Sequence, residues 1–206
     1  MSEKKAPGAR AAKPAPKQPV QLDPQYITRL TVTLLAICVV VALLLGVTNA
    51  ITKPLIDEAK AEKARAAMMA VFPADEYVPV ERELPKGISA WYTVRHGSTS
   101  VGWVLETTAA GSQGPITMMV GVDINGEVTG VSVISHSETS NIGTKVVDSQ
   151  TVLDRLIGMS HADGEITLNA GTNRFDGVSG ATYSSKGVVA GVNAALDAVA
   201  PDVGKW

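Results

Sequence analysis

The sequence predicts an α+β protein in which a single N-terminal transmembrane helix precedes one domain built on an antiparallel sheet with packed helices. Two observations predict this class. The 206 residues include an uncharged stretch from Leu30 to Thr52, and short β-branched runs separated by glycine begin near Tyr77. The part of the chain after Tyr77, about 130 residues, is enough for one compact domain.

The uncharged stretch is long enough to cross a bilayer. Its 23 residues reach about 34 Å at a helical rise of about 1.5 Å, against a hydrocarbon core of about 30 Å. Apolar side chains occur on every side, unlike the single apolar stripe of a surface helix. A cleaved signal peptide is the alternative, but its apolar run usually has about 7 to 15 residues. We therefore expect a retained anchor over residues 27–52.

Charges divide sharply around this segment. Up to Arg29 there are six basic and two acidic residues, a balance of +4, whereas from Lys53 onward 12 basic residues stand against 18 acidic ones, a balance of −6. Positive segments beside a membrane helix tend to stay in the cytoplasm. We therefore predict a cytoplasmic N-terminus, a single pass through the cell (inner) membrane and an extracytoplasmic domain.

The segments on either side of the span have distinct compositions. Residues 1–26 form a basic tail rich in proline and alanine, which cannot build a core. Residues 53–76 contain many strong helix formers and predict a helical connector that ends near Pro73. Pro54 is expected either to kink the junction or to start a new helix.

The domain, residues 77–206, is expected to contain an antiparallel sheet and two helices. Asn125-Gly126 lies between two predicted strands and is the strongest short hairpin signal. Glycine and alanine in the last helix would allow close backbone approach, and its apolar face would hold Val188, Val192, Ala195 and Val199. The expected strands are residues 89–95, 101–108, 116–123, 128–135 and 165–168, and the expected helices are residues 146–157 and 184–199.

The most informative segment leads into the last helix. It reads Asp176-Gly177-Val178-Ser179-Gly180-Ala181-Thr182-Tyr183-Ser184-Ser185. Its hydroxyls cluster where unpaired N–H groups and the positive end of a helix face outward, which suits a phosphate. The alternative is an ordinary helix cap in which Thr182 or Ser184 supplies the oxygen, and the residues alone favour that cap.

This segment resembles a known modification motif. Asp-x-x-Ser-Gly-Ala-Thr is similar to the recognition sequence of the flavin transferase that attaches FMN to threonine, and the surrounding domain resembles the FMN-binding domain of bacterial membrane redox pumps. The resemblance implies that Thr182 Oγ1 is joined to the FMN phosphate by a phosphodiester. Asp176 is expected to serve recognition by the transferase. The other residues expected to bind the cofactor here are Ser179, Gly180, Ala181, Ser184 and Ser185.

A second element of the resemblance is His136-Ser137-Glu138-Thr139-Ser140-Asn141-Ile142-Gly143. It is similar to the family pattern His-x-Glu-Thr-Pro-Gly-x-Gly, with Ser140 and Asn141 in place of Pro-Gly. Asparagine still tolerates the left-handed backbone that glycine would supply, so a similar turn is expected. The resemblance implies that Glu138, Thr139 and Gly143 line the flavin pocket.

A third element is Gly111-Ser112-Gln113-Gly114-Pro115-Ile116, which resembles a Gly-Tyr-x-Gly-Pro-Ile pattern with Ser112 in place of the aromatic residue. This loop is expected to be structural. The three elements in order after one span look most like the G subunit of the Rnf complex. The C subunit of the sodium-pumping NADH:quinone reductase is a similar alternative.

The resemblance implies an electron-relay subunit of a membrane-bound, ion-translocating ferredoxin:NAD oxidoreductase complex that carries covalent FMN. Its expected partners are the other subunits of the complex, the flavin transferase and membrane lipid. A non-enzymatic, membrane-anchored binding or scaffold module is the alternative from a different class.

Other functions have weaker support in the residues. No Gly-x-Gly-x-x-Gly follows a strand, so this chain is not expected to oxidise NADH itself. His136 and Glu138 have a spacing that suits a metal, but a third ligand is missing and no metal site is predicted. No nucleic-acid partner is predicted either. We expect no catalytic residues and no complete activity from this chain alone.

Overall fold

The computed structural model describes residues 24–205. The predicted tail, residues 1–26, therefore lies outside the described residues except for its last three positions. The chain divides into two compact units, and the boundary between them falls after Pro54.

The long helix α1, Pro24–Val71, contains the predicted span. Among the described residues, it is the one helix long and apolar enough to cross a membrane, and its most apolar window is not buried at all. Pro54 lies inside this helix and does not start a new one. A proline at that position removes one intrahelical hydrogen bond without ending the helix. The predicted connector is thus the second part of α1, which ends two residues before Pro73.

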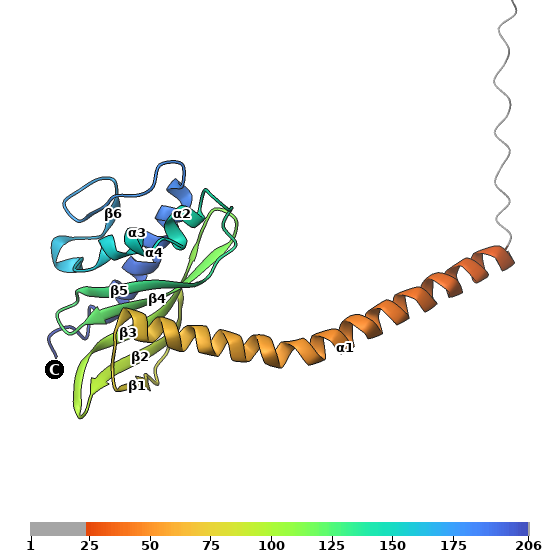
Figure 1. The fold of residues 1–206 in the computed structure, drawn as a ribbon, viewed down its shortest axis with the longest axis horizontal. Coiled ribbons are helices and arrows are strands. Elements are labelled where there is room, and N and C mark those ends of the chain that lie inside the picture. The colour runs from red at the N-terminus through yellow and green to blue at the C-terminus, as the bar shows by residue number, and fades with distance from the viewer. Residues whose placement is uncertain (1–23, 206) are drawn as a thin grey trace, which may run out of the picture. The chain divides into compact units, whose positions relative to one another are not determined.

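A five-stranded antiparallel sheet forms the centre of the second unit (Figure 1). The strand order follows the chain, and every neighbouring pair is antiparallel. The antiparallel core and its four long strands are therefore as predicted. The short β1 was not predicted, because its four residues are too few to show an alternating pattern. The strands are β1 Glu76–Pro79, β2 Ile88–His96, β3 Thr99–Ala110, β4 Pro115–Asp123 and β5 Val128–Ser135.

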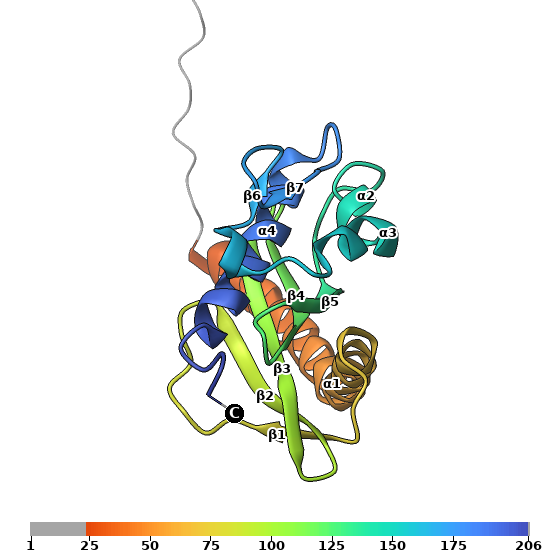
Figure 2. The same cartoon turned by 90° about the vertical axis from the view of Figure 1, so that its left-hand side faces the viewer.

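Side chains alternate along these strands and so belong to two separate cores. Trp103 and Leu105 of β3 lie in one core, while Val104 between them lies in the other. Met118 and Met119 of β4 divide in the same way. The first core is covered by α4, Thr182–Val199, and the second by the last turns of α1, on opposite faces of the sheet (Figure 2).

The segment after β5 is less regular than the predicted helix over residues 146–157. Ser149 has an extended backbone, with φ −99° and ψ 98°, and interrupts the helix there. The apolar spacing that predicted a helix is still used, because Val146, Val147, Leu153 and Leu156 are all buried. The elements formed are α2 Thr144–Val147, α3 Gln150–Leu153 and 3-10 turns at Asp154–Leu156 and His161–Asp163.

The strand predicted over residues 165–168 is shorter than expected. It is reduced to β6, Thr167–Leu168, which pairs in parallel with an unpredicted strand β7, Arg174–Phe175. Two residues are too few to show the alternation by which a strand is recognised in a sequence.

Helix α4 packs closely on the sheet and carries the predicted motif at its start. A Cβ atom on Gly187 would lie 2.7 Å from the carbonyl oxygen of Ala110, and one on Gly191 would lie 3.0 Å from Met118 Sδ. The close approach predicted from the glycines is confirmed at these two positions. The predicted apolar face is buried as well, at Val188, Val192, Ala195 and Val199.

Two glycines that pair across β4 and β5 allow the end of α1 to pack closely on the other face of the sheet. These are Gly121 and Gly130. A Cβ atom on Gly130 would lie 2.8 Å from Val71 Cα and 2.9 Å from Val71 O. The Thr129 hydroxyl donates a hydrogen bond to the same Val71 oxygen at 2.8 Å. The absence of side chains at 121 and 130 therefore lets α1 contact the sheet directly.

Candidate functional site

A small cavity lies where three loops meet at the beginning of α4. Its volume is about 40 Å³, which is far below the range of about 300 to 1,000 Å³ that is usual for small-molecule pockets. A ligand as large as a flavin would enter it only in part and would remain partly at the surface. The lining residues are Ser112, Glu138, Thr139, Ile142, Gly143, Gly180, Ala181, Tyr183 and Ser184.

Thr182 is the first residue of α4, and its side chain is exposed between the lining residues Ala181 and Tyr183. The N-cap residue is Ala181, with φ −116° and ψ 36°, and no side chain caps the helix. The interpretation of this motif as a side-chain cap is therefore wrong. Thr182 lies one position too far along the chain to cap the helix, and the Ser184 hydroxyl is bonded elsewhere.

The start of α4 is electrostatically suited to an anion. The helix has 18 residues and no acidic residue in its first turn. The N–H groups of a first turn precede the intrahelical bonding pattern and carry the positive end of the helix dipole. The first such bond here is donated by Ser185 N to Ala181 O at 2.9 Å. A phosphate held at Thr182 would lie beside the donors that precede this bond.

Glu138 is the central polar side chain of the cavity, and only 7% of the residue is exposed. Its Oε1 accepts hydrogen bonds from Ser112 N at 2.7 Å and Gln113 N at 3.3 Å. Its Oε2 accepts one from the Ser184 hydroxyl. The carboxylate thus joins the loop before β4, the loop after β5 and the first turn of α4.

These contacts decide the charge of Glu138. Burial by itself would raise the pKa of this carboxyl group, but the hydrogen bonds from Ser184, Gln113 and Ser112 lower it below its ordinary value. The carboxylate is therefore ionised at neutral pH, with its oxygens already bonded within the protein.

The loop after β5 has the tight turn that the sequence predicted. Asn141 adopts φ 63°, which confirms that asparagine supplies the left-handed conformation in place of glycine. The N–H of Gly143 donates to Thr139 O at 3.0 Å and closes the turn. A Cβ atom on Gly143 would lie 2.7 Å from both Glu138 Cβ and Ser184 Oγ. Only glycine leaves the carboxylate room to reach α4.

Most of the predicted cofactor-binding residues meet at the cavity, but Thr182, Ser179 and Ser185 do not line it, and neither does Asp176, the residue predicted for transferase recognition. Ser179 is exposed. Ser185 is buried, and its hydroxyl accepts a hydrogen bond from Val178 N at 3.4 Å within the motif. Asp176 is exposed on the outside, where its Oδ1 lies 2.8 Å from Arg174 Nε. Those that line the cavity are Glu138, Thr139, Gly143, Gly180, Ala181 and Ser184.

Three lining residues were not singled out from the sequence as binding residues: Ser112, Ile142 and Tyr183. Tyr183 is 72% exposed and Ile142 is 51% exposed, so both present apolar surface at the mouth of the cavity. Both have large side chains inside two of the sequence motifs, which could have indicated a binding role. Ser112 acts through its backbone N–H, so residue type gives no signal there.

The loops of the cavity lie in a part of the chain that matches a known domain family. Residues 111–197 match the model of the FMN-binding domain family, a range that includes all three loops of the cavity. A crystal structure of NqrC from Shewanella oneidensis is similar at 19% sequence identity and a TM-score of 0.47, covering 68% of this chain and 72% of that one.

Relatives of known name match nearly the whole chain. The G subunit of the ion-translocating oxidoreductase complex of Methanosarcina acetivorans is 30% identical over 189 residues, 88% of this chain and 99% of that protein. The G subunit of the Na⁺-translocating ferredoxin:NAD⁺ oxidoreductase complex of Acetobacterium woodii is 29% identical, covering 87% and 95%. The proton-translocating counterpart of Clostridium ljungdahlii is 25% identical, covering 86% and 94%. The chain therefore belongs to the family of G subunits of ion-translocating oxidoreductase (Rnf) complexes.

Proposed function

We propose that this chain is the electron-relay subunit of a membrane-bound ferredoxin:NAD oxidoreductase complex of the Rnf type, and that it carries FMN bound covalently through Thr182. The covalent attachment is supported by the exposure of Thr182 and by its position in the helix. Its side chain is exposed at the first position of an 18-residue helix that no side chain caps. The hydroxyl is therefore accessible, and the helix start favours the phosphate that would be attached to it.

The attachment needs an activated flavin nucleotide as its second reactant. An alcohol and a phosphate monoester do not condense readily in water, so the transferase must use an FMN phosphoanhydride. The Thr182 Oγ1–P bond forms as the anhydride P–O bond breaks, the other phosphate of the anhydride leaves with the electrons of that bond, and the hydroxyl proton passes to the transferase or solvent. The product is a phosphodiester with one negative charge at the positive end of α4.

FMN supplies the redox chemistry, and the protein supplies position and environment. The cavity takes up only part of a flavin, and the exposed Tyr183 and Ile142 at its mouth offer apolar contacts for the remainder. A flavin partly exposed in this way is accessible to redox partners. The covalent bond would keep it on the protein in spite of the small cavity.

The partners follow from the family. Relatives named as sodium-translocating and as proton-translocating both have a G subunit that resembles this chain over most of its length. We infer that this subunit does not select the ion. Residues 30–52 contain no ionisable side chain apart from Cys38, which also supports an ion pathway in other subunits.

The domain is proposed to lie outside the cytoplasm, anchored by the first part of α1. The support is the balance of +4 before the span and −6 after it. In this orientation the transferase must be exported to reach Thr182. A covalently bound flavin also cannot be lost by dilution outside the cell.

The test is to express the full chain with and without a flavin transferase, denature it, and measure its intact mass and in-gel fluorescence. We expect one FMN on the peptide that contains Thr182 and none in Thr182→Ala. Thr172→Ala, an exposed threonine in the preceding loop, is the matched control and should be fully modified. Flavin retained by denatured Thr182→Ala would contradict the attachment site.

Asp176→Ala provides a second arm of the same experiment. Its exposed position, fixed by Arg174 and by an Arg155 Nη1 bond to its carbonyl oxygen at 3.0 Å, suits recognition by another protein. We expect a large loss of FMN incorporation without loss of folding. Full incorporation would exclude Asp176 from transferase recognition.

A further inference from the structure

All three histidines of the chain pair with an aspartate, but only one is also bonded to the loop of the proposed flavin site. His136 Nδ1 accepts a hydrogen bond from the backbone N–H of Glu138 at 3.2 Å. Its other ring nitrogen, Nε2, lies 2.9 Å from Asp148 Oδ1. The pairs are His136–Asp148 at 2.9 Å, His96–Asp75 at 3.3 Å and His161–Asp197 at 3.3 Å.

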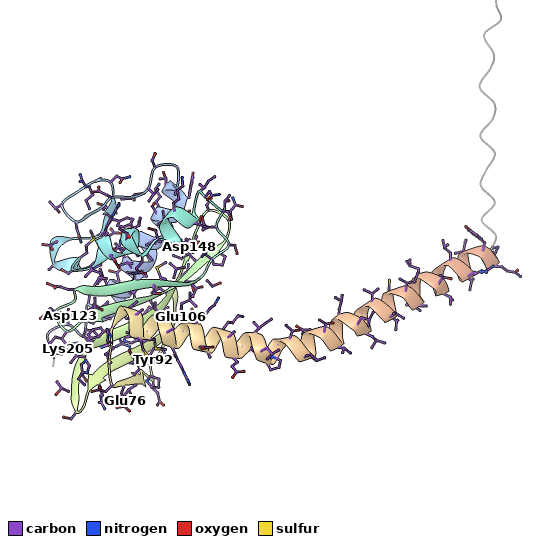
Figure 3. The ribbon with its side chains drawn as sticks, in the orientation of Figure 1. Glu76, Tyr92, Glu106, Asp123, Asp148 and Lys205 are labelled. Atoms are coloured by element: carbon purple, nitrogen blue, oxygen red, sulfur yellow. The ribbon has the colours of Figure 1, made fainter. Side chains whose placement is uncertain are left out.

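The two bonds of His136 define its tautomer. A ring nitrogen that accepts from an N–H group carries no proton, so Nδ1 is bare and the proton lies on Nε2. Nε2 then donates to Asp148 Oδ1. Asp148 favours this tautomer over the other, in which an Nδ1–H would face the Glu138 N–H. Asp148 is exposed and follows directly after α2 (Figure 3). It does not line the cavity.

The hydrogen bond from its N–H to His136 Nδ1 holds the backbone of Glu138 in a position from which its side chain reaches three partners. Its carboxylate binds Ser112 N and Gln113 N on one side and the Ser184 hydroxyl on the other. Ser184 lies two residues after Thr182 in the first turn of α4. Exposed Asp148 is therefore connected to the helix start that carries Thr182 through His136, the backbone and side chain of Glu138, and Ser184.

We propose that His136 and Asp148 are positioning residues of the flavin site, which hold the Glu138 carboxylate in place through the Nδ1 atom of the imidazole. Their effect on the flavin rests on the proposed function, but their effect on the loops does not. The pair controls how firmly the loop before β4 and the start of α4 are joined. The attached flavin should respond to that junction in its mobility and its redox potential.

Three substitutions separate this role from a general effect on folding. In His136→Asn the amide oxygen can replace Nδ1 as the acceptor, whereas in His136→Gln the amide lies near the position of Nε2 and the acceptor at Nδ1 is lost. Asp148→Ala leaves the imidazole free to adopt the other tautomer. His96→Gln and His161→Gln are matched controls, because those histidines are also paired with aspartates but, among the described residues, are not hydrogen-bonded to the cavity loops.

The first measurement is amide hydrogen exchange in the full chain without flavin, in detergent. Ser112 N and Gln113 N should exchange about fivefold faster in His136→Gln and Asp148→Ala, the factor for loss of one ordinary hydrogen bond. His136→Asn and both controls should exchange like the original chain. In a chain that already carries His136→Asn, the further change Asp148→Ala should not alter these exchange rates.

The second measurement uses the full chain after loading with FMN. In His136→Gln and Asp148→Ala the flavin fluorescence anisotropy should fall and the midpoint potential should shift, while the intact mass still shows one FMN. His136→Asn should restore both values. A potential that His136→Asn restores is not expected from a merely structural role.

The outcomes separate the two proposals. Unchanged exchange at residues 112–113 in both His136→Gln and Asp148→Ala would overturn the positioning role, and so would a His136→Asn chain that behaves like His136→Gln. Asp148→Ala changes an exposed side chain, so the test remains decisive if His136→Gln fails to fold. A wild-type chain without FMN would instead contradict the proposed function, and the exchange measurement would still decide the positioning role.

Discussion

Glu138 contributes a buried charge to the candidate site, and Thr182 contributes an exposed hydroxyl. The carboxylate is stabilised by donors from the protein itself, so it needs no ligand to compensate it. The N–H groups at the start of α4 remain for the phosphate proposed at Thr182. The two residues therefore differ in their roles: Glu138 holds the loops together, and Thr182 presents the proposed attachment point.

Glu138→Gln should destabilise the protein in a pH-dependent way. The pKa of Glu138 is lower in the folded chain than its ordinary value of 4.5. Its ionised form therefore stabilises the folded state above pH 4.5, and this contribution is lost as pH falls through the lowered pKa. At neutral pH we expect the free energy of unfolding to fall by about 1 to 3 kcal/mol, the cost of poorly satisfied buried donors.

Denaturant unfolding of the full chain in detergent, at neutral pH and below pH 4.5, measures this effect. The difference between Glu138→Gln and the original chain should shrink in acid. Glu127→Gln, an exposed glutamate, is the control and should change stability by no more than about 0.5 kcal/mol. A loss that is equal at both pH values would contradict the pKa argument.

Among the elements, α1 and α4 pack on opposite faces of one sheet, and glycines decide how closely each approaches. The alternation of Trp103, Val104 and Leu105 in β3 separates the two cores. The long strands were predictable because their alternation and the Asn125-Gly126 turn are local signals. The division of the predicted helix over residues 146–157 was not, because long-range packing outweighs a weak helical pattern there.

Gly130→Ala should displace the end of α1 from the sheet. A Cβ atom at this position would lie 2.8 Å from Val71 Cα and 2.9 Å from Val71 O, and neither backbone atom can turn aside. We expect the free energy of unfolding to fall by about 1 to 3 kcal/mol, the usual cost of overpacking. Thermal or denaturant unfolding of the full chain measures it.

Gly114→Ala is the matched control for this change. Its added Cβ atom would lie 3.4 Å from Ser137 Cβ, the closest atom, which is an ordinary contact. FMN incorporation should be normal in Gly130→Ala molecules that fold, because the site lies at the start of α4 and not at the end of α1. Equal stability of the two variants would show that the contact at Val71 is not tight.

For the whole molecule, the near-zero net charge hides the opposite charges on the two sides of the uncharged span. The chain has a formal net charge of −2, which combines the +4 before the span with the −6 after it. Membrane proteins tend to keep positive flanks in the cytoplasm. The orientation proposed for the domain thus rests on the distribution of charge along the chain and not on its total.

This orientation predicts the protease access of the two termini. In sealed cells or spheroplasts, a tag at the C-terminus should be cleaved by added protease, and a tag at the N-terminus should be protected. Replacing the basic residues of the tail, Lys4, Lys5, Arg10, Lys13 and Lys17, with uncharged ones should weaken this asymmetry. Protection of the C-terminal tag in intact cells would contradict this orientation, but it would not bear on the proposed attachment of FMN at Thr182.

The sequence by itself determined the features that depend on neighbouring residues: the apolar span, the long strands, the turn at Asn141 and the motif that ends at Thr182. Only the tertiary structure decided that no side chain caps α4, that α1 is seated on Gly121 and Gly130, and that Glu138 joins three loops. The physical reason is distance along the chain. Glu138 is 26 residues from Ser112 and 46 from Ser184, and contacts over such separations leave no periodic pattern in the sequence.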